Sequence, residues 1–446
     1  MVSANIEIIN DLNEFFQKTM SDKETKMRYI NKATDFTRKR SLSFSNMVAL
    51  HINLLKRSLS VELESFFSHI GSAPVTKSAF CQQRRKLKPV FFQDWNDTLV
   101  SSYYRNTRGQ KKMWRGFRVF AIDGTKLSLP NTPALRQHFG YSTNQHGTKS
   151  ATARASVLYD VLNKLVVNSR LCPLEEAERT TACDLIPFLD KDDLLLLDRG
   201  YPSFMLFYLL INRQDCHFVM RTQANFSKVV DEFRSSGKKD ETVTLRATYK
   251  AINGLRNQGV EIPSETEVKV RLVRIRLDDG QDEILITNLY DTKAYTRPVL
   301  KELYFLRWPV ETTYGYLKNE LQVECFSGIS PISIEQDFYA NIFVFNLQAV
   351  IEEGCEKYVQ AVNRQRRIKY KINKNVCWAL MKGRVIDLFL HAEQAGYLLK
   401  ELTSLFERYL ESDRPGRKYL RTKKSIKLLG KYVTLTNYKR AVLGLT

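Results

Sequence analysis

The run DLLLLD, residues 193–198, places four consecutive leucines between two acids. An uninterrupted apolar run of this kind is typical of a strand that is buried on both faces. A second run, FRVFAID at residues 117–123, is rich in strand-forming residues and also ends in an acid. A glycine follows each acid within two residues. The two runs therefore predict central strands of an α/β sheet, with Asp123 and Asp198 placed where the strands end.

A third acid changes how these two aspartates are interpreted. Either aspartate alone would more often be a turn or cap residue that accepts hydrogen bonds from nearby backbone N–H groups. Glu311, however, lies in VLKELYFLRWPVETTYGYLKNELQ, residues 299–322, which has helix formers and apolar residues at helical spacing. Three carboxylates together describe a metal-dependent nuclease site.

Glu311 belongs to a spaced set of polar residues, Y-x2-R-x3-E-x6-K, made of Tyr304, Arg307, Glu311 and Lys318. Glu311 and Lys318 are seven residues apart, about two helical turns, so their side chains share one face. Pro309 either kinks the helix or begins a new one, so Tyr304 and Arg307 can be placed on this face only roughly. The alternative is an ordinary amphipathic helix with solvated charges.

These residues resemble the DDE transposases of bacterial and archaeal insertion sequences. The chain is similar to the insertion-sequence-four family, whose signature is the Tyr-Arg-Glu-Lys spacing. The stretches DGTKLSLP (123–130), DRGY (198–201) and RWPVE around Glu311 also resemble landmarks of that family. The resemblance spans roughly residues 75–350. It implies an α/β fold with an RNase H-like, mixed-sheet catalytic core, interrupted by a β-rich insertion and flanked by helical N-terminal and C-terminal regions.

The resemblance also implies roles for individual residues. Asp123, Asp198 and Glu311 would be the catalytic metal ligands, holding two Mg2+ ions with Mn2+ as a substitute. Tyr304, Arg307 and Lys318 would contact the terminal phosphates of the element. Oxygen ligands suit these hard cations, and a two-metal site can activate water and stabilise the leaving 3′ oxygen. The sequence shows no H-E-x-x-H pair, Walker loop or G-x-S-x-G elbow that would indicate a different chemistry.

Composition agrees with a nucleic-acid partner. The 446 residues carry a formal net charge of +21, and such a charge attracts polyanions in a salt-sensitive way. Anionic membranes would also attract it, but no apolar stretch reaches the roughly 18 residues of a spanning helix. The seven cysteines include no C-x-x-C pair, which indicates a reducing compartment and no zinc site. We therefore expect a cytoplasmic, nucleoid-associated prokaryotic protein that binds double-stranded DNA and no membrane.

Changes of pattern divide the chain into five predicted segments. They are a helical N-terminal DNA-binding region (1–115), the first part of the RNase H-like core (116–221), a β-strand insertion (222–298), the core helix that carries Glu311 with the following helix (299–360), and a basic helical C-terminal region (361–446). The order β-β-β-α-β-α-β expected over the second segment is the one an RNase H-like core requires. The basic tail from residue 414 is either a surface for DNA or a partner, or a disordered extension.

Successive helices over residues 41–89 suggest a unit similar to a helix-turn-helix, with Thr76 as the cap of its third helix. Arg84, Arg85 and Lys86 on this helix would then contact DNA. A charged face exposed to solvent explains the same pattern equally well.

Together these observations predict an enzyme, a DDE transposase that performs cut-and-paste DNA transposition. It would bind the terminal inverted repeats of its element, cleave the ends by metal-dependent hydrolysis, and join the 3′-OH ends to target DNA. The resemblance further implies a hairpin intermediate and a homodimer in the synaptic complex. Two alternatives are another RNase H-like DNA nuclease and a non-catalytic DNA-binding derivative that acts as a repressor.

Overall fold

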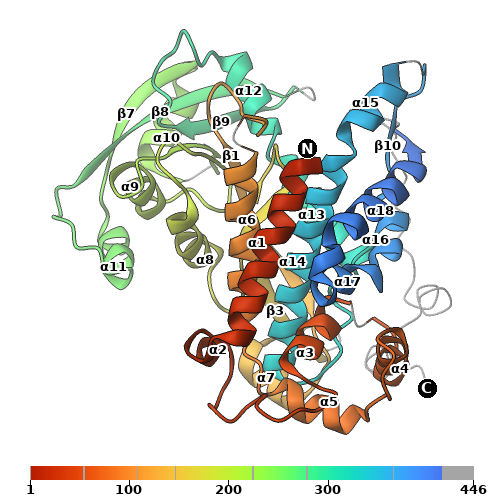
Figure 1. Ribbon diagram of the computed structural model, residues 1–446. Helices are drawn as coiled ribbons and strands as arrows, with labels where there is room; N and C mark the ends of the chain where they lie inside the picture. The colour runs from red at the N-terminus through yellow and green to blue at the C-terminus, as the bar shows by residue number, and fades with distance from the viewer. Residues whose placement is uncertain are drawn as a thin grey trace. The chain divides into compact units, whose positions relative to one another are not determined.

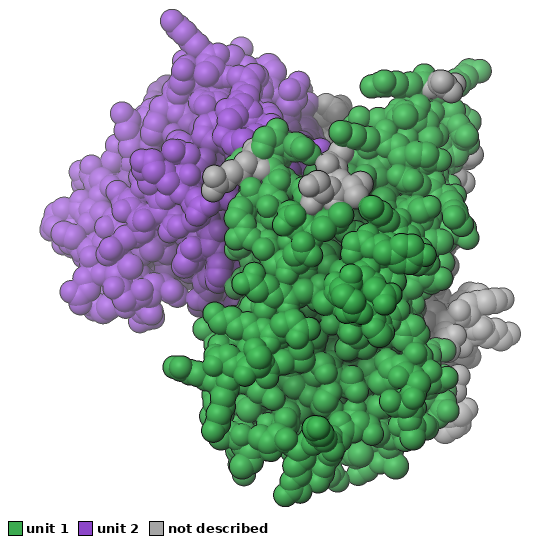
Figure 2. All heavy atoms as spheres, viewed as in Figure 1, with its two compact units in different colours: residues 1–111, 127–153, 315–446 green, residues 112–126, 154–314 purple. Residues whose placement is uncertain are grey.

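The computed structural model describes residues 2–53, 56–107, 109–145, 147–223, 226–277, 280–364 and 366–413. The chain forms two compact units, which Figure 2 colours separately. The first unit contains residues 1–111, 127–153 and 315–446, and the second contains residues 112–126 and 154–314. Each unit is therefore assembled from segments that are far apart in the sequence.

The second unit is built on a mixed sheet with two parallel strand pairs at its centre. β1 (Val119–Ser128) pairs in parallel with β5 (Leu194–Leu197), which pairs in parallel with β6 (His217–Arg221). The strand order is β2-β3-β1-β5-β6-β9-β8-β7, and β4 pairs with β3 off this path. The other strands are β3 (Lys149–Asp160), β4 (Leu165–Pro173), β7 (Asp240–Arg246), β8 (Glu267–Arg276) and β9 (Asp282–Thr287), while β2 (Tyr141–Thr143) lies in the part of the chain that belongs to the first unit. All four leucines of β5 are buried, as a strand covered on both faces requires.

The order of elements along the chain agrees with the predicted β-β-β-α-β-α-β pattern. β1, β3 and β4 are followed by α8 (Glu178–Leu185), β5, α9 (Phe204–Asn212) and β6, while α7 (Pro133–Phe139) and β2 lie between β1 and β3. A hairpin joins β3 to β4, and Lys164 in its turn has a φ of 62°. The fold class is therefore mixed α/β.

The predicted end of the first strand at Asp123 is wrong. β1 continues through Gly124 to Ser128, and Gly124 does not adopt the positive φ of a turn. Leu127 in this continuation is buried, so the strand keeps an apolar contact beyond the acid. Asp123 therefore lies within a strand, whereas Asp198 directly follows one.

Residues 222–298 extend the same sheet. β9 pairs antiparallel with β6, and β8 pairs antiparallel with both β9 and β7. Two helices that the sequence did not indicate, α10 (Lys228–Ser235) and α11 (Tyr249–Asn257), lie between these strands in the chain. The predicted short strands are thus present, and the domain boundaries proposed from sequence stay predictions.

The segment with the spaced polar residues forms two helices. α12 (Arg297–Phe305) ends before Arg307, and α13 (Trp308–Asn319) begins directly after it. Pro309 therefore lies in the first turn of a new helix, where its missing N–H has no intrahelical acceptor to lose. This outcome selects one of the two roles predicted for the proline.

The first unit is mainly helical. Its helices are α1 (Val2–Ser21), α2 (Lys23–Tyr29), α3 (Phe44–Ile52), α4 (Leu59–His69), α5 (Lys77–Arg84), α6 (Val90–Asn106), α14 (Pro331–Gly354), α15 (Glu356–Arg364), α16 (Lys374–Met381), α17 (Arg384–Leu390) and α18 (Ala395–Arg408), with a small antiparallel pair β10 (Tyr370–Ile372) and β11 (Leu410–Ser412). Figure 1 shows α1, α6 and α14 side by side. Their core includes Trp95, whose ring stacks on Phe343 with 4.0 Å between centroids.

Three predictions concern the ends of this unit. Thr76 caps α5 as expected, since its side-chain oxygen accepts from the Ala79 N–H at 3.2 Å. The basic tail, residues 414–446, lies outside the described residues. Over the described part of the chain, no helix has both the length and the apolar character needed to cross a membrane.

Candidate active site

Asp198 occupies the position directly after β5, at the edge where the parallel strands end. The Arg221 guanidinium lies 3.1 Å from its carboxylate, and the Tyr304 hydroxyl donates to the same oxygen at 3.3 Å. Arg221 is the last residue of β6, the parallel neighbour of β5. The sheet therefore brings a cation and an acid to one edge.

Asp123 lies beside Asp198 on the neighbouring strand. Ala121 in β1 pairs with Leu196 in β5, and the two aspartates come two residues further along their chains. Because side chains in strands alternate with a period of two, both aspartates are expected on one face, on strands about 4.8 Å apart. Burial raises the pKa of Asp123 to about 6, and the charges of Glu311 and Asp198 act in the same direction. The Gly124 N–H and Arg307 oppose this shift.

Glu311 joins the two aspartates from the first turn of α13. The Arg307 guanidinium donates to its carboxylate at 2.8 Å, one helical turn away along the chain. Arg307 itself is 5% exposed, and its Nε atom has no hydrogen-bond acceptor among the described residues. A buried arginine with a free donor is thus held next to the acids.

Tyr304 and Arg307 keep the protonation states that a role in phosphate binding requires. Burial raises the pKa of the Tyr304 phenol, so the hydroxyl stays a hydrogen-bond donor. Burial alone would lower the pKa of Arg307, but Tyr304, Glu311 and Asp198 outweigh it and the pKa rises. Both side chains can therefore donate to an anion at neutral pH.

The three acids interact electrostatically without forming a compact coordination cluster. Among the described residues, no group of three or more His, Cys, Asp or Glu side chains is arranged so that it could hold a metal ion. Instead, Asp198 is bound by Arg221 and Tyr304, and Glu311 by Arg307. The donor set is nevertheless the hard oxygen set that Mg2+ and Mn2+ prefer.

Comparison with known proteins assigns the region that contains these residues. The family model of the transposase DDE domain matches residues 114–347, more than half of the chain. The chain belongs to the transposase DDE domain family. The matched region includes Asp123, Asp198 and Glu311 together with Tyr304, Arg307 and Lys318.

Two bacterial relatives are transposases by name. The transposase InsG for insertion sequence element IS4, from Escherichia coli (strain K12), is 24% identical over 241 residues, which are 52% of this chain and 52% of that protein. The putative transposase InsZ of the same strain is 23% identical over 203 residues, 45% of this chain and 60% of that protein. The matched part of this chain therefore spans between about half and three fifths of the length of these relatives.

One solved structure shares a coarse similarity with the chain. It is the cryo-EM structure of a piggyBac transposase synaptic complex with hairpin DNA. The similarity has a TM-score of 0.40 at 11% identity, and it covers 97% of this chain and 83% of that chain.

Lys318, the last residue of the predicted signature, lies on α13 in the part of the chain that belongs to the first unit. The helix confirms that about two turns separate it from Glu311. Its contact with DNA stays a prediction.

Two residues at this candidate site were not selected from the sequence. Arg221 ends a strand in HFVMR, and the same strand-end argument that selected Asp198 would have found it. Tyr314 on α13 is 7% exposed, and its hydroxyl donates to the Asp123 backbone carbonyl at 2.6 Å. No local signal distinguishes Tyr314 from the other aromatic residues of its helix, because its partner comes from a distant strand.

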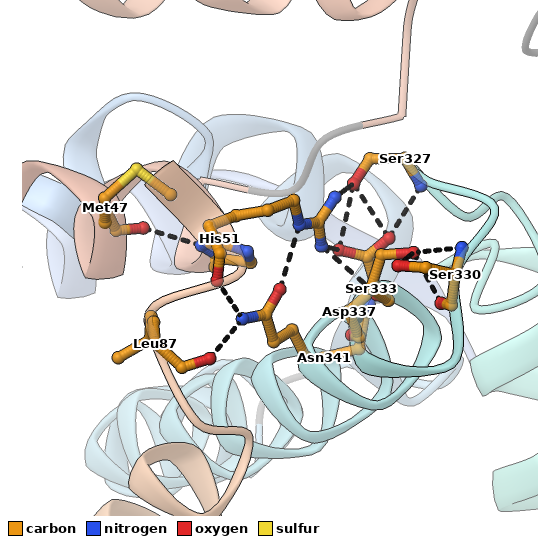
Figure 3. Close-up of polar contacts among 10 residues, drawn as sticks. Met47, His51, Leu87, Ser327, Ser330, Ser333, Asp337 and Asn341 are labelled. Carbon is orange, nitrogen blue, oxygen red and sulfur yellow. Dashed lines mark hydrogen bonds and ion pairs between the residues drawn. The ribbon is translucent and has the colours of Figure 1, made fainter. Parts of the chain in front are cut away.

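Arg84 occupies a different environment from the one predicted. Its guanidinium is buried in the first unit and makes four hydrogen bonds, and Figure 3 labels three of the residues that accept them, Ser327, Ser333 and Asp337. The acceptors are Gln336 Oε1 and Ser327 Oγ at 2.9 Å, the Ser333 carbonyl at 3.2 Å and Asp337 Oδ1 at 2.9 Å. Because α14 supplies three of these acceptors, Arg84 ties α5 to α14. This placement contradicts the predicted DNA contact of Arg84.

Arg85 and Lys86 are more accessible than Arg84. Arg85 is exposed at the C-terminal end of α5, and Lys86 is half-buried with its Nζ donating to Gln83 at 2.9 Å. Their contacts with DNA stay predictions.

Proposed function

We propose that this chain is the transposase of an insertion sequence, of the insertion-sequence-four type with the Tyr-Arg-Glu-Lys signature and an RNase H-like catalytic core. The observation that carries the proposal is the environment of Asp123. This acid lies in the family-matched region, partly buried on a central strand and close to two further acids, and partial burial with these neighbours raises its pKa to about 6. Carboxylates gathered in this way need a cation nearby, as a metal-dependent nuclease supplies.

Asp123, Asp198 and Glu311 would hold the metal, two Mg2+ ions with Mn2+ as a plausible substitute. Bound there, the ions would activate the attacking water and stabilise the leaving 3′ oxygen. The residues fit this role because they are oxygen ligands that are already in electrostatic contact. Metal binding would compete with the bonds that Arg221, Tyr304 and Arg307 now make to Asp198 and Glu311.

Arg307 and Tyr304, which metal binding would release from the acids, are suited to bind the substrate. Arg307 can offer a pair of parallel N–H donors to one phosphate, and Tyr304 can add a hydroxyl donor. Their burial limits their motion and so holds the phosphate in one orientation. Lys318, two turns along α13 from Glu311, would provide a further point charge.

The reaction has two steps. In the first, water attacks the phosphorus at the element end, the bond from phosphorus to the 3′ oxygen breaks, and a 3′-OH and a 5′-phosphate remain. The proton lost by the water passes to solvent, and one proton returns to the leaving oxygen. In the second step the 3′-OH attacks a phosphodiester of target DNA, so one bond replaces another without an external energy source. This two-step scheme does not require a hairpin intermediate.

Double-stranded DNA would be the partner at both steps, first at the terminal inverted repeats and then at the target. The net charge of +21 supports attraction to DNA. A homodimer in the synaptic complex would pair the two element ends, since a cut-and-paste event must process both of them.

The experiment uses the full chain and DNA that carries the inverted repeats found beside its gene. We expect strand cleavage at the element end in Mg2+ or Mn2+ and none in EDTA, with joining to a plasmid target. Binding of the ends without cleavage in either metal would overturn the enzymatic proposal and indicate a repressor. Cleavage of branched or damaged DNA in preference to the ends would indicate a different nuclease.

A further inference from the structure

A polar cavity lies at the edge of the second unit beside the acids. Its volume is about 480 Å3, and it is lined in part by Arg199, Arg221, Arg234, Gln281 and Glu283. The arginines come from the segment after β5, the end of β6 and the last turn of α10. The cavity therefore collects cations from parts of the chain that are distant in sequence. Its volume is within the range of about 300–1,000 Å3 that small-ligand sites have.

Two of these arginines have donors without acceptors. The Nε atoms of Arg221 and Arg234 are buried, and neither has a hydrogen-bond partner among the described residues. A buried donor that remains unpaired is costly, and an acceptor bound from outside is one way in which such a donor is satisfied. The two atoms indicate an acceptor that would enter the cavity.

The charges around the cavity favour an anion. Three arginines, Arg199, Arg221 and Arg234, line the cavity together with only two carboxylates, Asp282 and Glu283. The carboxylates of Asp282 and Glu283 are already paired with arginines, at 3.5–3.6 Å and 2.6 Å respectively. The local excess is positive, and the lining is polar rather than apolar. A phosphate with its several acceptor oxygens meets these donors better than a neutral base would.

Arg221 connects the cavity to the proposed chemistry. One of its nitrogens lies 3.1 Å from Asp198, and the other lies 2.6 Å from Glu283. The side chain of Arg221 would therefore connect an anion in the cavity to Asp198, a proposed metal ligand.

We propose that this cavity binds one phosphate of the DNA backbone, a short distance from the phosphate that is cleaved, with Arg234 and Arg221 as its main ligands. The inference rests on the proposed function and adds a second phosphate position to it. By holding the strand at a neighbouring phosphate, the cavity sets the position of the cleaved bond relative to Asp198. Arg234 is a DNA-binding and positioning residue in this view, because it touches the strand and not the reacting atoms.

The test replaces single phosphates of the element-end DNA by uncharged methylphosphonates and measures binding and cleavage by the full chain. For the wild type, we expect one position next to the cleavage site at which the replacement weakens binding by about ten- to hundredfold, the range of a charge-assisted hydrogen bond. For Arg234→Gln, the same replacement should have little further effect, because the partner is already missing. Arg234→Gln should also make the dependence of log K on log salt less steep, by about the amount that corresponds to one phosphate contact.

The matched control is Arg246→Gln. Arg246 ends β7, is exposed and pairs with Glu267, so its loss removes the same charge from a position outside the cavity. We expect normal methylphosphonate sensitivity and an unchanged salt slope for this variant. Arg234→Lys keeps the charge without the planar fork, and it should keep the slope while recovering only part of the affinity. Thermal unfolding of each variant identifies any loss of folded protein.

The outcomes separate this inference from the proposed function. If the wild type cleaves its ends but Arg234→Gln retains the full methylphosphonate profile and salt slope, the cavity does not bind DNA and the inference is wrong. If inorganic phosphate protects wild type against thermal unfolding, and protects Arg234→Gln equally, the cavity is also not the phosphate site. If the wild type cleaves no element end, the proposed function fails, whereas a methylphosphonate effect that Arg234→Gln removes would still support the cavity as a DNA-binding site.

Discussion

Each guanidinium nitrogen of Arg84 in the first unit has a hydrogen-bond acceptor, whereas Asp123 in the second unit lies close to two further acids. Arg84 is 2% exposed and makes four hydrogen bonds, one of them to Asp337. Asp123 is only partly buried, but its neighbours include two other acids and its pKa is raised to about 6. The first cluster holds helices together, and in the second the neighbouring acids disfavour the ionised form of Asp123.

This difference distinguishes a structural network from a site. A buried ion pair with satisfied hydrogen bonds is stable as it stands, and breaking it is costly. An acid whose pKa is raised by burial destabilises the folded state when it is ionised. A cation that binds to the acid restores this stability. Burial of charge by itself therefore does not indicate function, whereas a strongly raised pKa among neighbouring acids marks a candidate functional site.

The largest expected effect is the loss of DNA cleavage when one of the three acids is replaced. Asp123→Asn, Asp198→Asn or Glu311→Gln should each reduce cleavage of the element ends by at least about a thousandfold, because the loss falls on metal coordination. Binding of the ends, measured by gel shift, should stay within about threefold of wild type. Cleavage at a near-wild-type rate by any one variant would remove that residue from the site.

The second largest effect is a loss of stability when the hydrogen bonds of Arg84 are removed. Arg84→Ala should lower the free energy of unfolding by roughly 3–5 kcal/mol, because Asp337 would be left buried without its partner. Arg85→Ala, at the exposed neighbouring position, should change it by no more than about 0.5 kcal/mol. Urea denaturation measures both. Equal stability of the two variants would mean that the network does not hold α5 to α14.

A third prediction concerns pH and Asp123. Its folded pKa of about 6 lies above the ordinary value of 3.8, so the folded state holds the proton more tightly. Stability should therefore fall as the pH rises from about 4 to 6, and ionised Asp123 should cost up to about 3 kcal/mol above that window. Asp123→Asn should remove this loss, so its advantage over wild type should be small at pH 4 and largest at pH 7.5.

Unfolding in urea at both pH values measures this effect, and Mg2+ provides its control. The ion should stabilise wild type at pH 7.5 and have much less effect on Asp123→Asn. An advantage of the variant that is independent of pH would show that Asp123 is not the group that titrates.

The smallest effect concerns Lys318. If it positions a phosphate, Lys318→Ala should slow cleavage of preassembled ends by about tenfold while metal binding is unchanged. If it serves only its helix, stability should change by ~0.3–0.5 kcal/mol and the rate should match wild type. Lys357→Ala, at an exposed position on α15, is the control for the loss of one charge.

The comparison also shows where sequence reasoning failed. Arg84 lies in the basic run Arg84-Arg85-Lys86, and charge alone could not distinguish its buried neighbourhood from the exposed position of Arg85. Its acceptors Ser327, Ser333 and Asp337 are more than 240 residues away along the chain. A pattern within a helix contains no information about such a distant partner.

The sequence by itself determined the central strands, the break at Pro309 and the choice of three acids, because apolar runs, proline geometry and residue spacing act locally. Only the tertiary structure decided that β1 continues past Asp123, that Arg84 is structural, and that Arg221 and Arg234 face one cavity beside Asp198. The physical reason is the same in each case. Local patterns set which element forms, whereas burial and electrostatic environment depend on which distant elements pack together.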